Sequence, residues 1–186
     1  MGSFSDFAEN EILDHALKVG AYTPPATIYV GLSTADPLDT GAGLAEPSGN
    51  GYARKAIFFG AASSRTITQD AQVNFDTATG AWGTVTHWAL FDAATDGNML
   101  AHGSLNSGIA VTSGKAPYIA SGGVAVSVNT GTWSNYLANM VLDWMFDGGT
   151  FTQPTNLYVA LVETTEITDA DTGSTIDELD MTGYAH

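Results

Sequence analysis

Hydrophobic side chains recur every three or four residues at the start of the chain and every second residue through most of its middle. The first pattern, over residues 4–18, predicts an amphipathic helix that Ser3 or Ser5 caps and that cannot continue through Pro24-Pro25. The second pattern predicts short strands at residues 27–33, 52–59, 66–75, 84–91, 99–105, 109–111, 116–120 and 124–128. Residues 1–128 are therefore predicted to form one mainly β domain, an antiparallel β-sandwich of about seven to eight strands with an N-terminal helix.

The opening of the chain is repeated near its end. Residues 4–32 align without a gap with residues 133–161. Identical pairs in this alignment include Ser5/Ser134, Asn10/Asn139, Leu13/Leu142, Asp14/Asp143, Gly20/Gly149, Pro25/Pro154 and Tyr29/Tyr158. Residues 129–186 are therefore predicted to be a partial second copy, with a helix at 134–146, a strand at 156–162 and an acidic loop.

The second predicted helix differs from the first because it is apolar on nearly all sides. Such a helix is buried, either in its own chain or in a partner's surface. The half-copy lacks sheet partners of its own, so it either packs back on residues 1–128 or adds to a neighbouring subunit as a docking element. We favour the second interpretation, which predicts a homo-oligomer, with a trimer as the first guess. The candidate interface residues are Trp133, Leu137, Met140, Val141, Trp144, Met145 and Tyr158.

The charge of the chain narrows the range of partners. It carries 20 acidic residues against 5 basic ones, a net charge of −15. This balance repels phosphate backbones and anionic lipid, so neither nucleic acid nor a membrane is predicted as a partner. The chain has no cysteine, which excludes disulfides and thiolate metal sites.

Few side chains suggest a metal-binding, catalytic or sugar-binding site. The acidic loop holds weak calcium candidates, Asp169, Asp171 and Asp177, but their spacing matches only the start of an EF-hand loop. No nucleophile elbow, phosphate-binding loop or zinc-protease motif occurs, so no catalytic residue and no cofactor are predicted. Trp82, in a predicted loop, is a candidate for stacking on a sugar ring, although aromatic side chains more often pack in the core.

Two histidines lie on the strands of one predicted hairpin. With Phe91 opposite Met99, His87 and His102 fall on opposite faces of the hairpin. That arrangement predicts no shared metal site and no catalytic pair, and it favours a local hydrogen bond for each ring.

The order of several motifs resembles a family of tailed-bacteriophage proteins. These motifs are SFSDFAENEILDH at 3–15, TPPATIYVGLSTADP at 23–37, NGYARKAIFFGAAS at 50–63, WGTVTHWALFDAATDGNMLAHGSL at 82–105 and a Gly/Val strand at 122–128. Members are commonly labelled tail-fibre or virion structural proteins. The resemblance implies a virion component and identifies no active site.

Together, these features predict a non-enzymatic structural protein on the exterior of a tailed-phage virion, of the tail-fibre or head-decoration type. Its expected partners are copies of itself and other virion proteins. The main alternative is a host-surface carbohydrate-binding module that uses Trp82. A polysaccharide-degrading enzyme is a weaker alternative, because separated carboxylates can converge in a fold.

Overall fold

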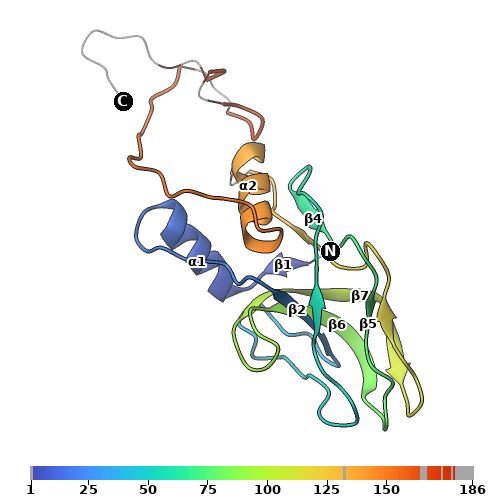
Figure 1. The fold of residues 1–186 in the computed structure, drawn as a ribbon. Coiled ribbons are helices and arrows are strands. Elements are labelled where there is room, and N and C mark those ends of the chain that lie inside the picture. The colour runs from blue at the N-terminus through green and yellow to red at the C-terminus, as the bar shows by residue number, and fades with distance from the viewer. Residues whose placement is uncertain (1, 132, 164–166, 173, 177, 179–186) are drawn as a thin grey trace.

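A computed structural model describes residues 2–131, 133–163, 167–172, 174–176 and 178. It shows a β-domain with two helices side by side at one end (Figure 1). The elements follow the order β1 (Ser3–Phe4), α1 (Asp6–Ala16), β2 (Ile28–Ser33), β3 (Lys55–Ile57), β4 (Thr66–Thr68), β5 (Val73–Asn74), β6 (Gly83–Phe91), β7 (Met99–Val111), β8 (Tyr118–Ile119), β9 (Ala125–Ser127) and α2 (Asn135–Phe146). The predicted mainly β, antiparallel fold with an N-terminal and a C-terminal helix is confirmed.

The largest sheet has five strands in the order β1-β7-β6-β2-β3. Two short pairs, β4-β9 and β5-β8, form the facing layer. Isolated bridges join this layer to both edges of the large sheet, Phe59 to Gln69 beside β3 and Gly2 to Val126 beside β1. The described strands therefore close on themselves, and the edges of the large sheet are covered.

The core lies between the two layers. Its largest fully buried side chains include Trp88, Leu90, Leu100, Ile57 and Ile67. A smaller cluster of Ala89, Phe91 and Met99 lies on the other face of the large sheet, where Leu44 covers it. Buried residues from Trp88 to Phe91 thus point alternately to the two faces of the sheet, which explains why this half of β6 is apolar without interruption.

A register shift interrupts the β6-β7 hairpin close to its turn. Phe91 pairs with Met99, but Leu90 pairs with Ala101, so Leu100 is an extra residue on β7. Since side chains alternate between faces, one extra residue exchanges the faces of β7 relative to β6.

Both helices begin in the same way. Ser5 and Ser134 are the N-caps, and their side chains accept hydrogen bonds from the backbone N–H groups of Ala8 and Leu137. This repeated cap satisfies a donor that the first turn of a helix leaves unpaired.

The chain beyond α2 does not repeat β2. Residues 155–161 lie outside any strand, and Val162 makes only an isolated bridge with Glu178. The prediction of a strand at 156–162 is therefore wrong, because the described part of the second copy contains no equivalent of β3 or β6 to pair with it.

Candidate assembly site at the paired helices

Helices α1 and α2 pack against each other through repeat-equivalent residues. His15 and Trp144 occupy the same position in the two copies, and their ring centroids lie 4.5 Å apart. Contacts around this pair are exchanged: the ring of His15 lies 5.0 Å from Phe151, and that of Trp144 lies 5.8 Å from Tyr22, the equivalent of Phe151. The contacts at the centre of this interface are therefore arranged around a local, approximate two-fold axis near His15 and Trp144.

Hydrogen bonds fix the buried His15 ring at this axis. Its Nδ1 accepts a hydrogen bond from the backbone N–H of Tyr22 at 3.3 Å, so its Nε2 donates to the carbonyl of Phe151 at 2.9 Å. Burial raises the pKa of the neighbouring Tyr22 to about 12, so its phenol stays neutral. The interface between the copies is thus specific and contains no charged side chain at its centre.

The opposite side of α2 is attached to the turn between β3 and β4. Ser64 and Arg65 form the centre of this turn, both with positive φ, as a two-residue hairpin turn requires. The Asp143 carboxylate accepts a hydrogen bond from the N–H of Ala62 at 2.5 Å, and the Asn139 side-chain oxygen accepts one from the N–H of Arg65 at 2.8 Å. Asn139 and Asp143, which are one helical turn apart on α2, therefore accept hydrogen bonds from two backbone N–H groups of the same β-turn.

The Arg65 side chain holds the entry to α2. Its guanidinium is buried and donates to the carbonyls of Val128, Asn129 and Trp133. It also pairs with the carboxylate of Asp169 at 3.2 Å. Three carbonyls within residues 128–133 and one carboxylate thus bind a single buried guanidinium. These contacts fix the position of the chain where the second copy begins.

Aromatic rings anchor the other end of α2. The ring of Phe146 is stacked on that of Phe4 at 5.8 Å and lies 5.3 Å from that of Phe59. Phe146 is only 6% exposed, whereas its equivalent in the first copy, Leu17, is 56% exposed. The end of α2 therefore closes the core of the β-domain.

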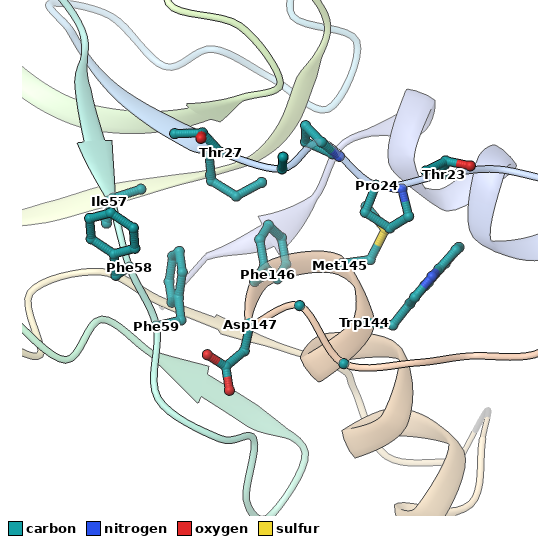
Figure 2. Close-up of a pocket in the computed structure, with 15 residues that line it drawn as sticks. Thr23, Pro24, Thr27, Ile57, Phe58, Phe59, Trp144, Met145, Phe146 and Asp147 are labelled. Carbon is teal, nitrogen blue, oxygen red and sulfur yellow. The ribbon is translucent and has the colours of Figure 1, made fainter.

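A groove of about 450 Å³ lies beside this anchor (Figure 2). One wall is the segment from Thr23 to Ile28, and another is formed by the end of α2 and the residues after it, 144–149. Phe58 and Phe59 form part of the rest. The groove is mixed in character, with apolar rings and the Asp147 carboxylate at its border.

The two sides of the interface between the copies differ at equivalent positions. On the α1 side, Gln153 donates to the carbonyls of His15 and Gly20, and Lys18 donates to that of Thr155. On the α2 side, the residue equivalent to Gln153 is Pro24, and that equivalent to Lys18 is Asp147. Neither of these side chains can donate the same hydrogen bond, so this side of the interface stays open.

The predicted interface residues divide into two groups. Val141, Trp144 and Met145 are buried within the chain, against α1 and the β-domain. Trp133, Leu137 and Met140 are half-buried, and Tyr158 is exposed. The interpretation that we favoured from the sequence, in which the whole half-copy docks on a neighbour, is wrong for α2, because this helix buries its apolar surface on its own domain.

Trp82 does not lie on the surface. It is 5% exposed, and its indole N–H donates to the carbonyl of Asn50 at 2.9 Å. Its ring also packs edge-on against Tyr52. This burial removes Trp82 as a residue that could stack on a sugar.

His87 and His102 share one face of the β6-β7 hairpin, contrary to the sequence prediction. Because of the extra residue Leu100, Ala89 pairs with His102, and both histidines border one shallow pocket. The ring of His102, on β7, lies 2.9 Å from the carboxylate of Asp39. This contact attaches the loop that follows β2 to β7. Among the described residues, however, no group of three or more histidine or acidic side chains could hold a metal ion.

The calcium candidates in the acidic loop are engaged within the chain. Asp169 accepts hydrogen bonds from the N–H of Gly131 and pairs with Arg65. Asp171 accepts hydrogen bonds from the N–H and hydroxyl of Thr168, which hold the pKa of this carboxyl below its usual range. Asp177 lies outside the described residues.

The sequence interpretation missed three residues that build the site: Arg65, Asn139 and Asp143. The signal for two of them was present, since Asn139 and Asp143 are identical to their equivalents in the first helix while most of the surrounding helix residues changed. The role of Arg65 gave no local signal, because its partners lie far along the chain.

The described residues form a closed β-domain onto which a partial second copy of its opening is packed. The described residues form no helix long and apolar enough to cross a membrane. The chain belongs to the family described as podophage GP4 fiber I protein gp80, whose sequence profile matches residues 3–127 and again residues 132–185. No curated protein matches the chain.

Family membership confirms the predicted phage-protein resemblance and its partial repeat. The protein is a structural component of a phage tail fibre, on the exterior of the virion.

Proposed function

We propose that the protein is a non-enzymatic subunit of the fibre that assembles as a homo-oligomer through the outer side of α2. The observation that supports this role is the state of the second family copy. Its described residues form a helix and an extended segment, and the helix packs on the first copy.

The proposed contact surface is one apolar stripe formed by residues of α2 and by Trp133, which precedes the N-cap Ser134. Trp133, Tyr136, Leu137 and Met140 follow helical spacing, and each keeps part of its surface exposed, with Tyr136 72% exposed. An apolar stripe of this kind on an otherwise anchored helix is typical of a subunit interface. A closed ring such as a trimer would bury it in every copy.

Sedimentation across a range of protein concentrations tests the homo-oligomer. We expect the parent protein to have a mass that is a multiple of the 19.3 kDa chain. The double variant Tyr136→Glu, Met140→Glu should have the mass of a single chain. Tyr118→Glu, at an exposed tyrosine of the β-domain, is the matched control and leaves the mass unchanged. A single 19.3 kDa species at all concentrations would refute the homo-oligomer.

Gold-labelled antibody against the chain tests its place on intact particles. Labelling of the fibres supports the proposed role. Labelling confined to the capsid, or cleavage of a host polysaccharide by the purified chain, would contradict it.

A further inference from the structure

The groove beside the end of α2 corresponds, through the repeat, to a closed contact beside the end of α1. Residues 23–28 and 144–149 form two walls of the groove, and their equivalents are residues 152–157 and 15–20. Hydrogen bonds join those two equivalent segments directly. The molecule therefore contains an example of the chemistry that closes such a groove.

Two side chains close the contact beside α1. Gln153 donates hydrogen bonds to the carbonyls of His15 and Gly20. The Lys18 ammonium donates one to the carbonyl of Thr155. A primary amide and a cation thus hold the end of the helix against the segment that crosses it.

The groove lacks both donors. Pro24 stands in place of Gln153, and Asp147 stands in place of Lys18. Proline has no N–H group, and an ionised carboxylate only accepts hydrogen bonds. The equivalents of the three accepting residues all line the groove: Trp144, Gly149 and Ala26. A ligand that closes the groove in the same way has to supply the donors itself.

The Asp147 carboxylate favours a cationic ligand. It is exposed at the border of the groove (Figure 2). Within the described residues, the lysine and arginine side chains of the sequence all have other acceptors, which are Thr155 for Lys18, Glu46 for Arg54, Asp76 for Lys55, Asp169 for Arg65 and Ala110 for Lys115. A second copy of the chain brings the same engaged side chains, so a different partner is the better source of the cation.

The remaining walls suit the stem of a long basic side chain. Phe58 is 65% exposed, and Pro24 and Pro25 are half-buried, all three beside the groove. Lysine and arginine pack their alkyl stems on apolar surface of this kind and keep the charge at its edge. The volume of about 450 Å³ lies in the range of about 300–1,000 Å³ that is usual for ligand sites.

We propose that this groove binds an extended, basic segment of another virion protein. A lysine or arginine of that segment pairs with Asp147 and donates to the backbone at the end of α2, as Gln153 and Lys18 do for their acceptors beside α1. Its alkyl stem packs on Phe58 and the two prolines. This inference rests on the place of the chain in the fibre and is independent of the proposed homo-oligomer, which uses other residues of α2.

Photo-cross-linking in purified particles tests the proposal. A benzophenone amino acid replaces Phe58 in one variant and Ala26 in another, at exposed positions on two walls of the groove. We expect both probes to capture one segment of the same virion protein, and mapping of the cross-linked peptide to find a lysine or arginine in it. The same probe at Tyr118, which is exposed and does not line the groove, should not capture that segment.

Charge variants test the role of Asp147. Asp147→Asn should lower the cross-linking yield of the Phe58 probe about three- to tenfold, because the partner's cation loses its counter-charge. Asp96→Asn removes the same charge at an exposed residue outside the groove and should leave the yield unchanged. Asp147→Lys should abolish capture, and replacement of the mapped basic residue by glutamate should then restore it.

The outcomes separate this inference from the proposed function. An unchanged yield with Asp147→Asn, or capture of a segment without a basic residue, overturns the inference. Capture of a segment of this same polypeptide also overturns it, as does the failure of both probes in particles that contain the chain. These results leave the proposed function intact, whereas absence of the chain from purified particles refutes both.

Discussion

Helices α1 and α2 descend from one sequence pattern but hold the molecule together in different ways. The entry to α1 is fixed by backbone pairing, since Ser3 and Phe4 form β1 beside β7. The entry to α2 is fixed by one side chain, the guanidinium of Arg65. The outer face of α1 remains exposed, whereas the same face of α2 closes the β-domain. A duplicated unit can thus keep its cap and its end signals while its neighbours decide which surface it buries.

The largest difference in stability between equivalent substitutions is expected at position 146 and its counterpart in the first copy, position 17. Phe146→Ala should lower the free energy of unfolding by about 3–5 kcal/mol, because it leaves a cavity between Phe4 and Phe59. Leu17→Ala is the matched control, and a change within about 0.5 kcal/mol is expected for that exposed residue. Denaturant unfolding measures both values. Similar losses for the two variants would show that the helices are anchored alike.

The second comparison concerns the contacts that fix the chain at the start of each helix. Arg65→Met should lower the free energy of unfolding by about 3 kcal/mol, because it removes the guanidinium that pairs with Asp169 and donates to the carbonyls of Val128 and Trp133. Faster hydrogen exchange should accompany this loss in α2 and be absent from α1. Lys55→Met, which removes an exposed pair with Asp76, should cost no more than about 1 kcal/mol. Uniformly faster exchange in both helices would refute a local role for Arg65.

The sequence predicted the two helices well, because helix signals are local. Residues 4–18 and 134–146 were predicted as helices, and the structure has α1 at Asp6–Ala16 and α2 at Asn135–Phe146. The strand predicted at 84–91 matches β6, whereas the two strands predicted at 99–105 and 109–111 are one continuous strand, β7. Periodicity alone carries this information, so no knowledge of neighbours was needed.

The errors arose where a neighbour decides the outcome. Residues 156–162 have the sequence of a strand, but a strand needs partners, and the described second copy supplies only an isolated bridge. The relation of His87 to His102 depends on one extra residue, Leu100, which no periodicity reveals. The apolar character of α2 correctly indicated burial, but it could not indicate whether the burial was on its own domain or on a partner.

The third comparison tests the hydrogen bonds from α2 to the turn. Asp143→Ala should lower the free energy of unfolding by about 1–3 kcal/mol, because the half-buried N–H of Ala62 loses its acceptor. Asp14→Ala, at the equivalent exposed position, should change it by less than about 0.5 kcal/mol. Thermal unfolding of both variants at one pH provides the measurement. Equal effects would mean that Asp143 acts only through the helix itself.

The smallest expected effect concerns position 9, where α1 has Glu9 and α2 has the buried Ala138. Partial burial, and then the charges of Asp39 and Asp6, raise the pKa of the Glu9 carboxyl. The folded state therefore binds this proton more tightly than the unfolded state. The resulting stabilisation is present below the unfolded pKa of about 4.3 and is lost as the pH rises through the higher folded value.

Glu9→Gln removes this titration, so the variant should unfold at a higher temperature than the parent at neutral pH, by a degree or so. Its advantage should vanish below about pH 4, where the glutamate is protonated in both states. Glu11→Gln, on the same helix, is the control variant. An advantage that persists unchanged in acid would mean that glutamine improves the helix itself, and that the acidic surroundings of Glu9 do not set α1 apart from α2.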